Sequence, residues 1–155
     1  MNTQEFQSLL KPIINAVEGE AIDQDLARTL NERFPPGEEF FDSIENACHQ
    51  AISEGWMCAQ GAEGRRFGRI IEPSEDTAML SVDVVDLTNI VGPHHKHPTG
   101  EVCMIMPTTE EARFDGMGRG WCVYEPGSDH RPTVTNGEAL VLYMLPHGRI
   151  EFTGK

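Results

Sequence analysis

The stretch His94-His95-Lys96-His97-Pro98-Thr99-Gly100-Glu101 decides how the rest of the sequence is interpreted. Residues two apart on a β-strand point to the same side, so His95 and His97 can aim at one point. The Pro98-Thr99-Gly100 break lets the chain turn and bring Glu101 back toward them. Two neutral imidazoles and one carboxylate suit a divalent metal such as zinc, iron or manganese.

A fourth ligand is expected further along the chain. The best candidate is His130, which ends the turn-like segment Glu125-Pro126-Gly127-Ser128-Asp129-His130. Lys96 and His94 alternate with the first two candidate ligands and are expected to face the other way. Any one of these histidines could simply be a solvated loop residue without a function. That explanation does not account for three histidines within four residues, followed by a spaced glutamate.

These two segments resemble the two sequence motifs of the cupin superfamily. The first motif has His-x-His followed by Glu, as in His95-Lys96-His97 and Glu101. The second has Pro-x-Gly-x-x-His or a close variant, and Pro126-Gly127-Ser128-Asp129-His130 is a shortened form of it. The resemblance implies a jelly-roll β-barrel with a metal inside, bound by His95, His97, Glu101 and His130.

Length and composition narrow the class of protein. A chain of 155 residues is expected to form a single cupin-like domain, 1–155, with a substantial core. Its net charge of −13 argues against nucleic acid and anionic membrane surfaces as partners. The N-terminus lacks the basic start of a secretory signal and no apolar run is long enough to span a membrane, so a cytoplasmic location is the default.

Residues 1–56 have helical periodicity, and 57–155 read as strands and turns. Thr3 can cap a first helix that Pro12 interrupts or restarts, and Asp23 can cap a second. A third helix is expected from about 38 to 54, ending at Gly55. We expect these helices to pack on the barrel or on a second subunit.

The strand region alternates apolar and polar residues over 80–85, and the runs 102–106 and 121–124 look like further strands. The apolar run 139–145 suits a strand that is covered on both faces. Turns are predicted between these strands, at Gly92-Pro93, Pro107, 116–120, Pro126-Gly127 and Asn136-Gly137. The fold class predicted is mainly β with an N-terminal helical segment, forming a cupin-type barrel over 57–155.

The whole chain also resembles a narrower family, the 4-hydroxylaminobenzoate lyases of bacterial nitroaromatic degradation. The segments that carry this resemblance are 92–101, Gly120-Trp121-Cys122-Val123-Tyr124, 126–134, and 137–152 with Leu142-Tyr143-Met144-Leu145-Pro146. The resemblance implies conversion of 4-hydroxylaminobenzoate and water to 3,4-dihydroxybenzoate (protocatechuate) and ammonia.

Such a reaction is redox-neutral, and the chain has no G-x-G-x-x-G fingerprint for nicotinamide or flavin. A metal at the cluster could polarise the hydroxylamine oxygen or supply hydroxide. Without a metal, His95, His97 and Glu101 could act as acid and base, with Glu101 as the proton shuttle.

The carboxylate of an aromatic substrate needs a cation, and arginine offers a two-pronged fit. Arg69 is the favoured candidate, because its strand could project it inward. Arg131 is a second candidate, and Arg113 and Arg119 flank a glycine-rich loop, 115–120, that could form a lid. Trp121, Tyr143 and His94 complete the candidate substrate-binding set, and His147 is interpreted as a loop histidine.

Two other functions fit the same motifs. One is a metal-dependent cupin dioxygenase acting on a small aromatic or thiol substrate, with iron carrying the redox chemistry. The other is a non-enzymatic metal sensor, since the Pro-Gly-Ser-x-His variant also resembles the zinc-binding cupin domain of anti-sigma factors.

The identity of the metal does not follow from the ligand set. A homodimer is the default assembly. Cys48, Cys58, Cys103 and Cys122 lack C-x-x-C spacing and are expected to be buried free thiols.

Overall fold

A computed structural model describes residues 1–155, and its helices come first in the chain. The first two are α1 (Thr3–Leu9) and α2 (Lys11–Val17). The cap of α1 is Asn2, whose side chain accepts a hydrogen bond from the Glu5 N–H, so the prediction of Thr3 as the cap is wrong by one residue. Pro12 lies in the first turn of α2, where its missing N–H breaks no helical hydrogen bond.

The other two helices match their predicted signals. Asp23 caps α3 (Gln24–Arg33) by accepting a hydrogen bond from the Leu26 N–H at 3.0 Å. Helix α4 (Glu39–Glu54) ends at Gly55, whose φ of 90° lies in the left-handed region that glycine adopts without a steric penalty. No helix combines the length and apolarity that crossing a membrane requires.

The strands form two antiparallel sheets. The large sheet has the order β1-β2-β3-β9-β5-β7, with β6 paired to β9, and the small sheet has the order β10-β4-β8. The strands of the large sheet are β1 (Gln60–Ala62), β2 (Arg65–Ile71), β3 (Leu80–Val91), β5 (Glu101–Pro107), β6 (Arg113–Phe114), β7 (Gly120–Tyr124) and β9 (Thr133–Pro146). Those of the small sheet are β4 (His95–His97), β8 (Ser128–His130) and β10 (Glu151–Phe152), and a 3₁₀ turn, η1 (Glu75–Thr77), precedes β3.

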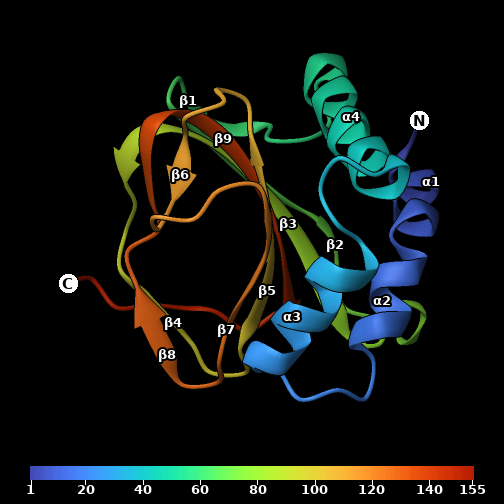
Figure 1. The fold of residues 1–155 in the computed structure, drawn as a ribbon. Coiled ribbons are helices and arrows are strands. Elements are labelled where there is room, and N and C mark those ends of the chain that lie inside the picture. The colour runs from blue at the N-terminus through green and yellow to red at the C-terminus, as the bar shows by residue number, and fades with distance from the viewer.

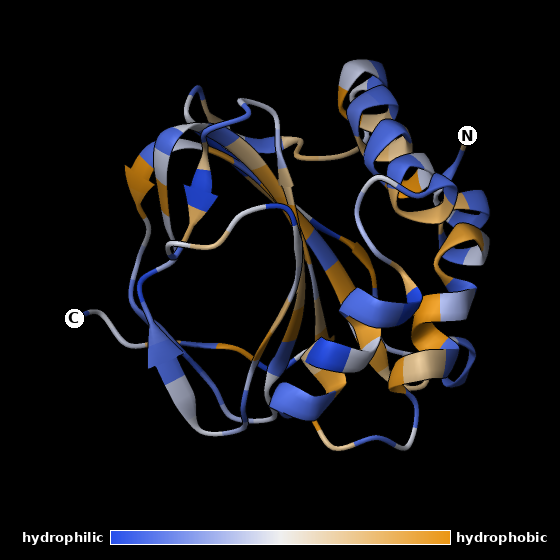
Figure 2. Cartoon of the chain, in the orientation of Figure 1, coloured by the Kyte–Doolittle hydropathy of each residue, from blue (hydrophilic) through white to orange (hydrophobic).

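The large sheet separates two environments (Figure 1). The four helices cover one of its faces, and the strands β4 and β8 lie on the other side. Hydrophobic residues gather where the helices meet the sheet, while the outer helix surfaces are hydrophilic (Figure 2). This helix face carries a cluster of 28 buried apolar residues, among them Phe6, Leu30, Phe41 and Leu142.

Alternation along the central strands sends neighbouring side chains to opposite faces. Strand β9 lies between β3 and β5, with Leu142 opposite both Val84 and Met104, and all three belong to the helix-face core. Tyr143, one residue on, lies opposite Asp83 and Cys103 on the other face. The prediction that 139–145 is a strand covered on both faces is confirmed.

The cupin-type jelly-roll arrangement predicted from the sequence is therefore present, with β strands following N-terminal helices. Its two sheets face each other but are not joined by strand pairing into one closed barrel. The prediction of a turn at Asn136-Gly137 is wrong, because both residues lie inside β9. They have positive φ values of 63° and 132°, and the pairing of β3 with β9 shifts register at this point, which is the mark of a β-bulge.

Candidate active site

Three histidines from two strands of the small sheet converge on one point. His95 and His97 lie on the same side of β4, and antiparallel pairing sets His130 of β8 directly opposite His95. The Nε2 atom of His95 lies 3.0 Å from that of His97 and 3.0 Å from that of His130, and the last two are 3.1 Å apart. An ion bonded to imidazole at roughly 2.1 Å can contact all three nitrogens at once.

The hydrogen bonds of the Nδ1 atoms, which point away from the centre, test whether the three histidines suit a cation. His130 Nδ1 lies 2.7 Å from the Asp115 carboxylate, and His95 Nδ1 lies 3.2 Å from the Pro93 carbonyl oxygen. Both partners are acceptors, so both Nδ1 atoms carry the proton and both Nε2 atoms present a lone pair. Two lone pairs facing each other at 3.0 Å repel, and a cation between them removes the repulsion. The donor set therefore fits a divalent metal.

The protonation of these rings agrees with a ligand role. Burial and then the neighbouring histidine charges lower the pKa of His95 to about 4 and that of His97 to about 3. Both rings are therefore neutral at pH 7. Neutral imidazole is the form that binds metal.

Glu101 lies beside this centre rather than at its focus. Its Oε2 atom is 3.4 Å from His97 Nε2, and its Oε1 atom accepts a hydrogen bond from the Cys103 thiol at 2.8 Å. The three histidines form the group of convergent ligand atoms, and Glu101 is not part of it. Burial raises the pKa of the Glu101 carboxyl to about 7, so both of its protonation states are accessible near neutral pH.

Asp115 orients one histidine of the centre from the loop after β6. Its carboxylate accepts hydrogen bonds from His130 Nδ1, from the Tyr124 hydroxyl and, at 2.9 Å, from the Thr133 N–H. Burial raises the pKa of this carboxyl, but these hydrogen bonds outweigh burial, so the pKa lies below its ordinary value. A carboxylate that holds the outer nitrogen of a ligating histidine is the usual support of a metal centre.

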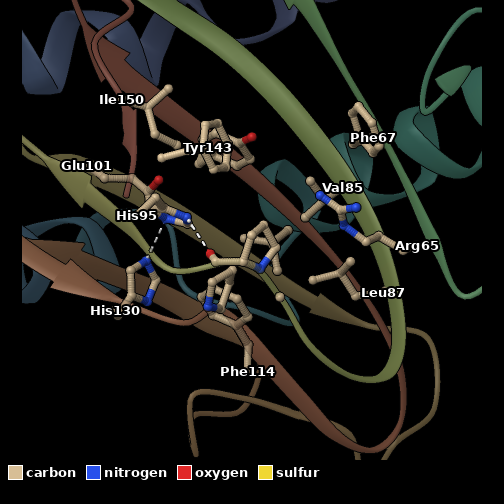
Figure 3. A pocket seen from close by; sticks show the side chains of 15 residues that line it. Arg65, Phe67, Val85, Leu87, His95, Glu101, Phe114, His130, Tyr143 and Ile150 are labelled. Carbon is tan, nitrogen blue, oxygen red and sulfur yellow. Dashed lines mark hydrogen bonds between the residues drawn. The ribbon is translucent and has the colours of Figure 1, made fainter. Parts of the chain in front are cut away.

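His95 and His130 open onto a cavity of about 110 Å³ that residues of both sheets line. Its walls are largely apolar, and His95, His130 and Glu101 lie at one end of it (Figure 3). Other lining residues include Val85, Leu87, Phe114, Val141, Tyr143 and Phe152. An apolar chamber with a few convergent polar groups is what a small aromatic ligand requires.

The candidate arginines are distributed unevenly around this cavity. Arg69 is not among the lining residues, because its guanidinium is bound to Asp83 at 2.9 Å and to the Gly148 carbonyl at 3.1 Å. Arg131 is exposed and also lies outside the lining. Arg113 and Arg119 hold loop carbonyls, and Arg119 pairs with Glu45 of α4.

Of the other predicted substrate-binding residues, some line the cavity and some do not. Tyr143 lines the cavity, whereas Trp121 belongs to the helix-face core and donates its indole N–H to the Phe34 carbonyl. His94 faces away from the metal ligands and contacts the Asp129 carboxylate at 2.8 Å. His147 is exposed and is not a lining residue. All four cysteines are buried free thiols, as predicted.

Two residues at the candidate site were missed by sequence reasoning. Asp115 was assigned only to a candidate lid, and no local pattern connects it to His130, fifteen residues further along the chain. Arg65, which lines the cavity, was not considered at all. Its spacing of four from Arg69 places it on the same face of β2, and this spacing was available in the sequence.

Comparisons with known proteins place the chain in a family. The model of the 4-hydroxylaminobenzoate lyase family matches residues 8–152. A 4-hydroxylaminobenzoate lyase of Nocardioides sp. (strain LMS-CY) is 31% identical over 150 residues, covering 91% of this chain and 89% of the relative. The enzyme of the same name from Pseudomonas putida is 31% identical over 153 residues, covering 88% and 87%. Among solved structures, a cupin-like protein of unknown function from Ralstonia eutropha aligns with a TM-score of 0.42 and 17% identity, over 56% of this chain and 57% of that one.

Proposed function

This chain belongs to the 4-hydroxylaminobenzoate lyase family, and we infer that it converts 4-hydroxylaminobenzoate and water to 3,4-dihydroxybenzoate and ammonia. In this reaction the N–O bond breaks and its oxygen leaves as water. One water oxygen adds to C3 of the ring, and a second water oxygen replaces the nitrogen at C4, which leaves as ammonia, so that one water is consumed overall. The atoms balance without an external oxidant or reductant. The enzyme is thus a carbon–nitrogen lyase that serves nitroaromatic degradation.

The observation that carries this proposal is the convergence of three imidazole Nε2 atoms at one end of an apolar cavity. His95, His97 and His130 would hold a divalent metal, which supplies Lewis-acid chemistry at the hydroxylamine group when bound. The apolar walls hold the aromatic ring and exclude bulk water from the reacting end.

Glu101 is proposed to move the proton that the leaving oxygen requires. It is buried, lines the cavity, and is the only carboxylate among the lining residues. Its Oε1 atom is occupied by the Cys103 thiol, so the proton is carried on Oε2, the oxygen beside His97. A positioned general acid contributes about 10²- to 10⁴-fold to a rate.

The decisive experiment is an ammonia-release assay on 4-hydroxylaminobenzoate under nitrogen. The purified protein should release ammonia and form 3,4-dihydroxybenzoate in equal amounts. The variant His97→Gln should lose about 1,000-fold or more of this activity, because it removes one of three ligand atoms from the centre. His49→Gln makes the same change on an exposed part of α4 and should leave the rate unaltered.

Two outcomes would count against the proposal. Folded protein that releases no ammonia with its metal retained is not a lyase of this substrate. Turnover that appears only when oxygen is admitted, with matching oxygen uptake, indicates the dioxygenase alternative. The organisation of the whole chain as one domain, the homodimer and the cytoplasmic location stay predictions from the sequence.

A further inference from the structure

One positive charge reaches the cavity from the large sheet. Arg65 begins β2, where Arg65 and Phe67 both line the cavity because residues two apart share a face. Its guanidinium carbon lies 5.1 Å from the centre of the Phe67 ring. Figure 3 shows Arg65 on the side of the cavity opposite His95 and His130.

Arg65 is the only arginine or lysine among the fifteen lining residues. It forms no ion pair and no side-chain hydrogen bond in the structure, so all its N–H donors are free. The other candidate arginines are either committed to protein partners or exposed outside the cavity. Arg69 is on the same face of β2, but Asp83 lies directly opposite it on β3 and neutralises it.

From this geometry we infer that Arg65 binds the carboxylate of the aromatic substrate, an inference that rests on the proposed lyase function. A free guanidinium presents two parallel N–H donors, which match the two oxygens of a carboxylate. The ring then lies along the apolar wall formed by Val85, Leu87 and Val141. The hydroxylamino group points to the histidine centre.

The ladder of the large sheet sets Arg65 and Glu101 far apart along the strands, which favours a substrate whose two polar groups are at opposite ends of the ring. Arg69, Asp83, Tyr143 and Cys103 form one row across β2, β3, β9 and β5, and this row is two residues from Glu101. Arg65 pairs with Leu87 in a row four residues further along, which is roughly 13 Å away at about 3.3 Å per residue. A para-substituted benzoate separates its groups along this direction, whereas an ortho-substituted one does not.

Binding of unreactive analogues tests this inference apart from turnover. Calorimetry would measure the affinity of the unmodified protein and of Arg65→Gln for 4-aminobenzoate and for 4-aminobenzamide. The second analogue has the same shape but no charge. We expect Arg65→Gln to weaken 4-aminobenzoate by about 10- to 100-fold and to leave 4-aminobenzamide within about 2-fold. In turnover, the same variant should raise KM for 4-hydroxylaminobenzoate with little change in kcat.

Two further variants sharpen the test. Arg65→Lys keeps the charge but not the two-pronged geometry, so it should recover only part of the loss. Arg66→Gln makes the same charge change on the opposite face of the same strand, and it should bind both analogues as the unmodified protein does. Thermal unfolding of each variant checks that the fold is kept.

The outcomes separate this inference from the proposed function. The role of Arg65 would be overturned if the unmodified protein bound the two analogues with equal affinity or did not bind 4-aminobenzoate. It would also be overturned if Arg65→Gln reduced the affinity for both analogues equally. Selective loss of the carboxylate analogue, in a protein that releases no ammonia from 4-hydroxylaminobenzoate, would support Arg65 and reject the lyase reaction.

Discussion

The two faces of the large sheet use the same strands for different purposes. On β9, Leu142 joins the helix-face core, and Tyr143, its neighbour in sequence, faces the cavity. On β5, Met104 is fully buried under the helices, whereas Glu101 and Cys103 face the site. The helix-face core has 28 buried residues, and the cluster on the cavity side has 9, so most apolar burial lies away from the chemistry.

This difference shows how the fold can hold buried polar groups close together. Asp83, Glu101, His95 and His97 are all buried, and burial of unpaired polar groups is costly. The apolar packing on the opposite face of the same strands offsets that cost. Substitutions on the helix face should therefore change stability with little effect on the site, and substitutions in the site should do the reverse.

The largest effect on stability is expected from Leu142→Ala. Leu142 has no exposed surface and lies between Val84 and Met104. Its truncation leaves a cavity and should reduce the free energy of unfolding by about 3 kcal/mol. Denaturant unfolding at a fixed metal concentration measures this loss, and kcat of the folded enzyme should stay within about 2-fold of the unmodified value.

Val91→Ala is the matched control for that substitution, because Val91 is 62% exposed at the end of β3. Its free energy of unfolding should change by less than about 0.5 kcal/mol. The separation of the two faces would be disproved if Leu142→Ala lowered kcat by as much as a substitution of a histidine in the centre.

The next effect is expected at the metal centre, from Asp115→Asn. The amide can donate to His130 Nδ1, which moves the ring proton to Nε2 and removes the lone pair from the centre. Zinc affinity, measured against a competing chelator, should fall by about 10- to 100-fold. The free energy of unfolding without metal should change much less than it does in Leu142→Ala.

A second aspartate–histidine pair provides the control for Asp115→Asn. Asp129 contacts His94 at 2.8 Å on the outer side of the same small sheet. Asp129→Asn makes the same chemical change outside the cavity and should leave zinc affinity unaltered. An equal loss of zinc affinity in both variants would mean that net charge, not the orientation of His130, controls the centre.

Local pattern was enough to predict most of the scaffold and the convergence of two of the three histidines. The helices follow from Asp23, Gly55 and the apolar period, and β9 follows from the run 139–145. His95 and His97 are two residues apart on one strand and share a face, so their convergence follows from strand geometry alone. His130 was chosen because it ends a turn-like segment further along the chain, and that segment also resembles the second cupin motif; nothing local connects it to β4.

The remaining features depend on pairing between distant strands. Arg65 and Arg69 lie on the same face of β2, so the sequence alone does not distinguish them. The register of β2 with β3 does, because it sets Asp83 opposite Arg69. Asp115 reaches His130 through a turn fifteen residues earlier in the chain. Asn136-Gly137 has the sequence of a hairpin turn, but the long pairing of β3 with β9 converts it into a bulge. Such contacts are not encoded in local periodicity.

The smallest effect is expected from the one acidic group on the helix face of β3. Asp86 follows Val84 on that face, and burial, followed by the neighbouring Glu138 carboxyl, raises the pKa of Asp86 from 3.8 to about 7. The folded state therefore binds this proton more tightly than the unfolded state does. The stability that it contributes is present below about pH 4 and is lost as the pH rises to about 7.

Asp86→Asn removes this pH dependence, because the amide does not titrate. Because the side chain is only partly buried, solvent screening limits the gain to about 1 kcal/mol at pH 8 relative to pH 5. Denaturant unfolding at the two pH values, compared with the exposed-carboxylate control Glu63→Gln, measures the difference. If Asp86→Asn and Glu63→Gln changed the pH dependence equally, overall charge would explain the effect, and the helix face would hold Asp86 at no cost.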